Sequence, residues 1–475
     1  MLALAAVGVV ALVALVSAAG IGGGGGPDIA SQAGAPSPQD ELDYAPERQA
    51  AFEESAIAGL SHVVYANAPG GAQATAERVA RFRDQIEAAT AGTDRDPNLV
   101  EALVYLESAG RPEVIAGRDP ELASGLTQIV ASTGISLLDM RIDLDRSRKL
   151  TVQARRALRR GDTAEVEKLL AERARVDERF DVDKALAATV DYLETSQQRF
   201  GSEDLAVVSY HMGIGNLENV IAGFTGSEGR AEDLVAAEDL SYAELYFDSS
   251  LVEHPQAWEL LAAFGDESSE YYWKLLASEE IMRLHREDPA QLRELERLHA
   301  EKATAEEVFH PRGETESFAD PGELENAWRD ADIVPLPQGE ELGYVLDPGM
   351  GELAPAVDAE PGLYRGLRPE TLETLFLIAA WVRELNGGGA LTVTSTVRDR
   401  EYQGALGKQN SEATTEYSLH TTGWSFDVLR EYESDSQAGS FQFVLDRLQA
   451  LGIIDYAVEP SAIHVTVADR PQPPS

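Results

Sequence analysis

The chain opens with an apolar run from Leu2 to Ile21 that only small residues interrupt. About twenty apolar residues in a helix can cross the hydrocarbon core of a bilayer, whereas the apolar region of a signal peptide is usually shorter. Five glycines, Gly22 to Gly26, follow directly and cannot continue a packed element. We therefore predict that residues 1–22 form a transmembrane anchor, with a cleaved signal as the alternative.

Residues 23–45 are rich in Gly, Pro, Ser and Ala and show no apolar periodicity, which is typical of a flexible tether. The anchor and the tether together predict a single-pass protein of the cell membrane. Its folded part is then expected outside the cytoplasm, or secreted if the first segment is cleaved. The membrane is thus the first expected partner.

The remaining chain is long enough for several domains, because the whole protein has 475 residues. Its formal net charge of −43 repels nucleic acid and anionic lipid head groups, so a nucleic-acid partner is disfavoured and none is expected. The chain has no cysteine, which excludes disulfides, thiolate metal sites and cysteine nucleophiles. Any bound metal must therefore use histidine and carboxylate ligands.

The pattern of apolar residues divides the folded part into three regions. Residues 46–226 have apolar positions three and four apart and predict a helical domain, with a charge-dense helical hairpin inserted near residues 140–178. Residues 227–360 predict short helices and an acidic connector, without a motif that carries chemistry. Residues 361–475 combine an amphipathic helix, Thr371–Leu385, with short alternating strands, which predicts an α+β domain. The expected fold class is therefore multidomain.

The helix predicted over Asn98–Gly110 ends in a carboxylate. Val100, Val104 and Glu107 follow i, i+4, i+7, so Glu107 shares a stripe with two apolar side chains. Partial burial and the negative end of the helix dipole both raise the pKa of a carboxylate at this position, which suits a general acid. A surface glutamate at a frayed helix end is the alternative for this stretch taken alone.

Three short motifs follow one another around this helix: Glu107-Ser108, then Ser124 to Ile129 (SGLTQI), then Ala206 to Asn216 (AVVSYHMGIGN). Over about residues 98–220 the chain resembles the soluble, goose-lysozyme-like lytic transglycosylases. The resemblance implies an α-helical lysozyme-like domain that needs no cofactor. It also implies cleavage of the β-1,4 bond between N-acetylmuramic acid and N-acetylglucosamine in peptidoglycan, leaving a 1,6-anhydro end.

The same resemblance implies the role of each residue. Most glycosidases use two carboxylates, but attack by the sugar's own 6-hydroxyl removes the need for the second. Glu107 then protonates the leaving oxygen and afterwards accepts the hydroxyl proton. Ser108, Gln128 and Tyr210 are the expected substrate-binding residues of this domain.

The sequence departs from the family pattern at two positions. Thr127 stands where the family usually has Met, and His211 follows Tyr210 where the family has Asn. Both changes concern contacts to the saccharide and leave the acid in place. Two alternatives remain open: a lysozyme-type hydrolase that leaves a reducing end, and a non-catalytic scaffold that binds peptidoglycan.

A second group of chemistry-bearing residues lies in the last hundred residues. The segment Ser418–Asp427 has the pattern S-x-H-x-x-G-x-x-x-D, and His464 follows on a predicted strand. Two histidines and one carboxylate, here His420, Asp427 and His464, can form a three-ligand site with an open position, as in catalytic zinc sites. Gly423 allows the turn that brings His420 and Asp427 together.

Residues 391–467 are similar to the zinc D,D-carboxypeptidase and L-alanyl-D-glutamate peptidase family, which also has an Arg at a strand end, here Arg398. The resemblance implies that Zn²⁺ is bound by the three ligands and that Arg398 binds a substrate carbonyl or carboxylate. The family's general base is a Glu three residues before the last His, where this chain has Ser461, and Glu459 lies five residues before it. A peptidase and a module that only binds stem peptides both remain open. The expected partners are therefore glycan strands and stem peptides.

Overall fold

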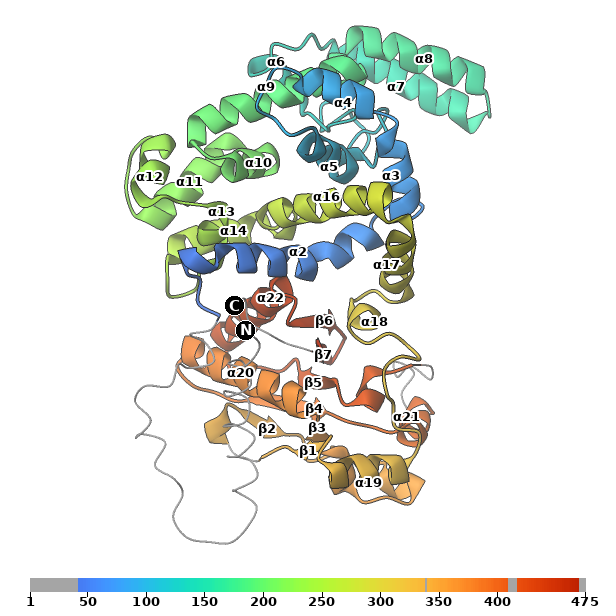
Figure 1. Ribbon diagram of the computed structural model, residues 1–475, viewed down its shortest axis with the longest axis vertical. Helices are drawn as coiled ribbons and strands as arrows, with labels where there is room; N and C mark the ends of the chain where they lie inside the picture. Colours follow the sequence, from blue (N-terminus) through green and yellow to red (C-terminus); the bar gives the residue numbers. More distant parts are fainter. Residues whose placement is uncertain (1–41, 338–339, 409–416, 470–475) are drawn as a thin grey trace. The chain divides into compact units, whose positions relative to one another are not determined.

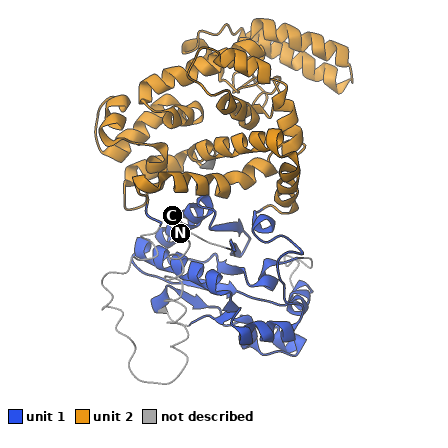
Figure 2. Ribbon diagram, in the orientation of Figure 1, with its two compact units in different colours: residues 1–43, 304–475 blue, residues 44–303 orange. Residues whose placement is uncertain are grey.

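The computed structural model describes residues 42–337, 340–408 and 417–469 (Figure 1). The chain divides into two compact units (Figure 2): the helical unit, residues 44–303, and the sheet unit, residues 1–43 and 304–475. The predicted transmembrane anchor and nearly all of the predicted tether lie outside the described residues. Among the described residues, no helix has the length and apolar character needed to span a membrane.

The helical unit is built almost entirely from helices. They are η2 (Pro46–Arg48), α2 (Gln49–Ala66), α3 (Ala72–Ala80), α4 (Arg83–Thr90), α5 (Pro97–Ser108), α6 (Ala131–Ser136), α7 (Leu144–Arg159), α8 (Thr163–Val176), η3 (Glu178–Phe180), α9 (Val182–Phe200), α10 (Glu203–Met212), α11 (Ile214–Thr225), α12 (Ala231–Glu238), α13 (Tyr242–Phe247), α14 (Pro255–Phe264), α15 (Asp266–Ser269), α16 (Tyr271–Glu287) and α17 (Pro289–Glu301). One hydrophobic core joins side chains as distant in sequence as Val64 and Leu292.

The helical unit does not end where we predicted. Its predicted boundary was residue 226, yet α16 packs against both α2 and α5 (Figure 1). Tyr271, Leu275 and Ile281 of α16 are part of the same core as Leu103 of α5. The compact unit therefore extends to Ala303, because the apolar faces of these later helices complete the core.

Helix α5 passes through the middle of this core. Asp96 caps its first turn with a side-chain hydrogen bond, and all residues from 99 to 105 are buried. The chain leaves the helix through Ala109 and Gly110, whose φ angles are 54° and 68°. A Cβ atom on Gly110 would lie 2.8 Å from the backbone nitrogen of Val79, so glycine permits this close approach of α3. These contacts fix the position of Glu107 in the last turn.

Helices α7 and α8 form the hairpin that the charge-dense segment predicts. Asp143 and Asp162 cap their first turns with side-chain hydrogen bonds. The two helices lie side by side and extend from the rest of the helical unit (Figure 1). They share a small apolar cluster formed by Leu150, Ala154, Ala157 and Leu169. The hairpin therefore packs largely on itself.

The sheet unit contains a five-stranded sheet and a separate two-stranded one. Its elements are α18 (Glu306–Phe309), α19 (Pro321–Asp330), β1 (Val334–Pro335), η4 (Glu340–Leu342), β2 (Tyr344–Leu346), η5 (Ala354–Val357), η6 (Pro361–Tyr364), β3 (Gly366–Leu367), α20 (Pro369–Asn386), β4 (Leu391–Ser395), α21 (Arg400–Gly407), η7 (Leu419–Thr422), β5 (Ser425–Leu429), α22 (Asp435–Ala450), β6 (Ile454–Val458) and β7 (Ala462–Val467). The larger sheet has the order β2-β4-β5-β7-β6, and β1 pairs with β3.

The larger sheet is mixed, since β2 and β4 are parallel and the other pairs are antiparallel. Helices α20 and α22 pack against each other and against the strands (Figure 1). The α+β character predicted for the C-terminal region is thus confirmed. The unit begins earlier than the predicted residue 361, because β2 and α18 belong to it.

Candidate functional site

Glu107 is held by a residue from a distant part of the helical unit. The hydroxyl of Tyr271, the first residue of α16, donates a hydrogen bond of 2.7 Å to Oε1 of Glu107. Burial raises the pKa of Glu107 to about 7, and the hydrogen bond from Tyr271 acts in the opposite direction. Near neutral pH this carboxyl group is therefore present in both protonation states, so it can donate a proton and also accept one.

Tyr210 of α10 lies near this carboxyl group but uses its hydroxyl elsewhere. It donates a hydrogen bond of 2.6 Å to the carbonyl oxygen of Thr127, and its oxygen lies 3.3 Å from Oγ1 of Thr189. Burial, followed by the negative charge of Glu107, raises the pKa of Tyr210. Tyr210 therefore connects the neighbourhood of Glu107 to the loop that precedes Gln128.

His211, which follows Tyr210 in α10, lies beside Tyr271. The two rings are stacked, with centroids 5.0 Å apart and planes inclined by 22°. Nδ1 of His211 is 3.0 Å from Oγ of Ser268, and burial lowers the pKa of the imidazole. A neutral imidazole at neutral pH thus covers one side of the tyrosine that binds Glu107.

Gln128 shapes its own loop. Its φ angle is 50°, and its Nε2 donates hydrogen bonds to the carbonyl oxygens of Gly125 at 2.7 Å and Val114 at 3.2 Å. Gly125 itself has a φ of 87°, and a Cβ atom there would lie 1.9 Å from the carbonyl oxygen of Arg179. Gln128 is an expected substrate-binding residue, and its amide nitrogen is engaged within the protein.

A buried ion pair between Arg179 and Asp177 contacts the backbone of the same loop. Arg179 and Asp177 are both fully buried and lie 2.8 Å apart. The guanidinium of Arg179 also donates hydrogen bonds to the carbonyl oxygens of Pro120, Leu122 and Ile129. Because the buried charge is paired and its donors have partners, the ion pair can fix the path of the loop.

Ser108 is buried and serves the end of α5. Its hydroxyl donates to the carbonyl oxygen of Val104 at 3.3 Å and accepts from the backbone nitrogen of Arg111 at 3.3 Å. These contacts satisfy backbone groups that a helix end leaves unpaired. The hydroxyl of Ser108, which was predicted to bind substrate, therefore has a structural role at the end of α5.

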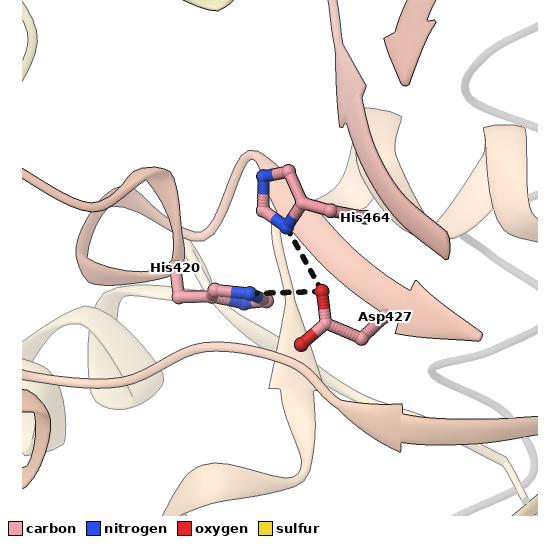
Figure 3. A group of neighbouring side chains, drawn as sticks. All are labelled: His420, Asp427 and His464. Atoms are coloured by element: carbon pink, nitrogen blue, oxygen red, sulfur yellow. Dashed lines mark hydrogen bonds and ion pairs between the residues drawn. The ribbon is translucent and has the colours of Figure 1, made fainter. Parts of the chain in front are cut away.

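The sheet unit brings His420, Asp427 and His464 together (Figure 3). Asp427 on β5 and His464 on β7 are direct partners in the antiparallel register, so their side chains share one face of the sheet. Oδ1 of Asp427 lies 2.8 Å from Nδ1 of His464 and 3.1 Å from Nε2 of His420. One potential ligand atom from each residue falls within 4.8 Å of the others, so the group could hold a metal ion.

Each imidazole of this group has a second partner that orients it. Nδ1 of His420 lies 2.9 Å from the carbonyl oxygen of Thr396, which leaves Nε2 as the acceptor nitrogen facing Asp427. Nε2 of His464 lies 3.4 Å from Oε2 of Glu306, a buried residue of α18. Contacts of this kind fix the ring orientation of metal-binding histidines.

The charges within the group are distributed unequally. Burial, together with the charge of Arg398, lowers the pKa of His420 to about 4. Burial also acts to lower the pKa of His464, but its hydrogen bonds with Asp427 and Glu306 outweigh this effect and raise the pKa to about 10. Although burial opposes it, the two histidines hold the pKa of Asp427 well below its usual range. Asp427 is therefore ionised near neutral pH, and an anionic ligand suits a cation.

Arg398 links this group to a cavity of about 130 Å³. Its Nη2 lies 3.4 Å from Oδ2 of Asp427, and its Nη1 donates to Oε1 of Gln403 at 2.9 Å. The cavity is also lined by the side chains of Tyr364 and Tyr402. A guanidinium in this position can bind a carbonyl or carboxylate oxygen of a ligand in the cavity.

The two positions considered for a general base lie in the turn between β6 and β7. Glu459 and Ser461 are both exposed, and the backbone nitrogen of Glu459 donates to the carbonyl oxygen of Ala462 at 2.9 Å. The charge of Glu459 acts on the pKa of Arg398, so the two side chains are within electrostatic reach. Neither position makes a hydrogen bond to the three potential ligands in the described part of the chain.

Two residues of these groups were missed by sequence reasoning. Tyr271 and Glu306 both come from the region 227–360, in which we found no motif. Comparison of the chain with protein-family models gives no match, and comparison with curated proteins gives none either. Its function is therefore inferred from the geometry of these two groups of side chains.

Proposed function

We propose that the protein is a peptidoglycan lytic transglycosylase that uses Glu107 as its acid and base. The supporting observation is the carboxyl group of Glu107, held at the end of α5 by Tyr271 with its pKa raised by burial to about 7. A carboxyl group that titrates near neutrality can perform both proton transfers of such a reaction.

In the proposed reaction, protonated Glu107 donates its proton to the glycosidic oxygen as the bond between that oxygen and C1 of N-acetylmuramic acid breaks. The carboxylate then accepts the proton of the 6-hydroxyl while that oxygen forms a bond to C1. The product carries a 1,6-anhydro ring, and Glu107 returns to its protonated form. The reaction needs no second carboxylate, and it consumes no water.

Tyr271 acts in this scheme as a positioning residue. Its hydrogen bond favours the ionised form of Glu107, which is the form needed for the second proton transfer. Burial favours the protonated form, which is needed for the first. Tyr210 and Gln128 are proposed to act through the loop around Thr127, since their polar groups hold its backbone.

We further propose that the sheet unit binds Zn²⁺ through His420, Asp427 and His464 and recognises stem peptides. Two imidazoles and one carboxylate, each imidazole fixed by a second contact, match the ligand set of catalytic zinc. When bound, zinc would polarise a carbonyl group. Arg398 would hold a ligand carbonyl or carboxylate in the adjoining cavity.

The proposed cellular site is the outer side of the cell membrane, with residues 1–22 as the anchor. Two units on one chain would then act on the same polymer at a high effective concentration. A second candidate for the sheet unit is binding of stem peptides without cleavage. Ser461 at the position of the family's general base favours this second candidate.

The test is digestion of purified sacculi by the full chain, with mass spectrometry of the products. The proposal expects 1,6-anhydro ends, which disappear in Glu107→Gln and persist in Glu54→Gln, an exposed carboxylate of α2. Reducing ends in place of anhydro ends would support a lysozyme-type hydrolase. Absence of glycan products from the unaltered protein would support a non-catalytic scaffold. Cleaved stem peptides that disappear with a chelator would separately establish a peptidase.

A further inference from the structure

The hairpin of α7 and α8 has the opposite charge to the rest of the protein. The chain has a net charge of −43, yet the segment from Arg141 to Arg175 contains eleven lysines and arginines and six acidic residues. Helix α7 alone has six basic residues and one acidic residue, Asp145. The hairpin is therefore a local cationic element on an anionic protein.

Part of this positive charge is already neutralised within the helical unit. Arg146 pairs with Glu172, and Arg148 pairs with Asp119 and Glu121. These pairs connect α7 to α8 and to the loop before Gln128. They explain the positions of two basic residues of α7 but not of the others.

Four exposed basic residues of the hairpin have no such partner in the described part of the chain. Within residues 42–337, 340–408 and 417–469, no hydrogen bond or ion pair involves the side chains of Lys149, Arg156, Arg159 or Arg160. Carboxylate partners are abundant in this chain, which has 82 acidic and 39 basic residues. These four cations nevertheless form no ion pair with the described residues. The charges are thus available to a ligand from outside.

Three of these cations form a row. Lys149 and Arg156 belong to α7, and Arg160 is the C-cap residue that continues it in the αR conformation; spacings of seven and four positions place the three on one side of the helix. At a rise of about 1.5 Å per residue the row is about 16 Å long. Leu150 and Ala154 lie on a different side of the helix and pack in the cluster shared with α8. The row is therefore exposed beside the hairpin's own core.

We propose that this basic row, formed by Lys149, Arg156 and Arg160, binds a linear polyanion that carries phosphodiester groups. Guanidinium groups bind phosphate oxygens in a bidentate manner, and a row of about 16 Å fits successive charges of an extended strand. A bilayer surface fits less well, because a helix that lies on a membrane buries an apolar face in it. The buried apolar residues of α7 pack against α8, and its two exposed large apolar side chains, Val152 and Leu158, lie on different sides of the helix and form no continuous apolar face.

The binding has to be short-ranged, because the net charge of the protein repels polyanions at a distance. At physiological ionic strength this repulsion is screened beyond about 8 Å, whereas direct contacts persist. Affinity is thus expected to fall steeply as salt increases. The proposed site does not involve Glu107, so its test is independent of the proposed glycan cleavage.

The experiment measures binding of poly(glycerol phosphate) to the full chain carrying Glu107→Gln, at about 50 and about 200 mM salt. The triple variant K149Q/R156Q/R160Q is expected to bind at least about tenfold more weakly at the lower salt. Its slope of log affinity against log salt should be smaller by about two, given about 0.7 per lost contact. The single variant Arg160→Gln, the mildest change, should weaken binding about two- to threefold.

The matched control is R230Q/R283Q/R297Q, which removes the same charge from exposed arginines that are already in ion pairs. Its affinity should stay within about twofold of the parent, because the row is intact. Equal losses in both triple variants would show a net-charge effect and overturn the proposal. Binding to phosphatidylglycerol vesicles without binding to the polymer would overturn it in favour of a membrane. Self-association that depends on the three residues, or absence of polymer binding, would also overturn it.

Discussion

The hydroxyl of Tyr271 lies 2.7 Å from Oε1 of Glu107, although 164 residues separate the two in sequence. The contact exists because α16 packs against α5 in one hydrophobic core. Burial and this hydrogen bond act on the carboxyl group in opposite directions. The proton affinity of Glu107 is therefore set jointly by the helix that carries it and by a helix from the far end of the unit.

The first prediction concerns Tyr271→Phe, which removes the hydrogen bond and leaves the ring. The hydrogen bond favours the ionised carboxylate, so its loss should raise the pKa of Glu107 above about 7. A hydrogen bond to a charged group contributes about 1.5 kcal/mol, which corresponds to about one pKa unit. In the pH profile of glycan cleavage, the limb assigned to Glu107 should move up by about that amount. Tyr272→Phe is the control and should leave the profile in place; an unchanged profile in Tyr271→Phe would contradict the assignment.

The second prediction concerns the dependence of stability on pH. The pKa of Glu107 is about 7 in the folded protein and about 4.3 in an unfolded chain, so between these values the folded state binds more protons. Stability contributed at this site is thus lost as the pH rises from 4.3 to 7. Glu107→Gln removes the loss, so the variant should gain on the order of 1–3 kcal/mol relative to the parent between pH 4 and pH 8. Urea denaturation at both values measures it, and a pH-independent difference would argue against a buried carboxyl group.

Local sequence patterns predicted the elements that carry the motifs. Apolar spacing predicted α5 and placed Glu107 at its end, and the spacing of His420, Asp427 and His464 predicted a group that the structure brings together. Glu107 lies on a single helix, and His420 and Asp427 lie on two short elements joined by the turn at Gly423, whereas His464 joins them through the pairing of β7 with β5. The side-chain period of a helix or strand then decides which residues share a face.

Partners from distant segments could not be predicted in the same way. Tyr271 and Glu306 contact Glu107 and His464 only because of tertiary packing, and neither has a diagnostic neighbour in sequence. The role of Gln128 could not be predicted from the motif either. A primary amide can bind a saccharide or close a turn, and the position of Gln128 in the sequence is the same in both cases. Its contacts with two backbone carbonyl groups became known only from the structure.

The third prediction concerns metal affinity in the sheet unit. Glu306→Gln weakens the contact that orients His464, and loss of such a partner usually lowers metal affinity by about 10- to 100-fold. His420→Ala removes a ligand and should abolish tight binding. Competition with a chromogenic chelator measures zinc affinity directly. The neighbouring Glu307→Gln is the control, and equal affinity in the Glu306 and Glu307 variants would rule out the positioning role.

The fourth prediction compares two glycines with similar backbone conformations. Gly125 and Gly161 have φ angles of 87° and 72°, so alanine at either position has the same backbone cost of about 1–2 kcal/mol. Their surroundings differ, because a Cβ atom at Gly125 would lie 1.9 Å from the carbonyl oxygen of Arg179, whereas nothing lies within 4 Å at Gly161.

Gly125→Ala must therefore push the loop off the buried pair of Arg179 and Asp177, and its total cost should reach about 3 kcal/mol or more. Gly161→Ala should lower the free energy of unfolding only by the backbone cost of about 1–2 kcal/mol that both positions share. Urea denaturation of both variants measures the difference, and glycan cleavage should fall in Gly125→Ala alone, because the same loop carries Gln128 and accepts the hydrogen bond from Tyr210. Equal stability losses would mean that the loop can shift without strain, in which case the buried ion pair does not fix its path.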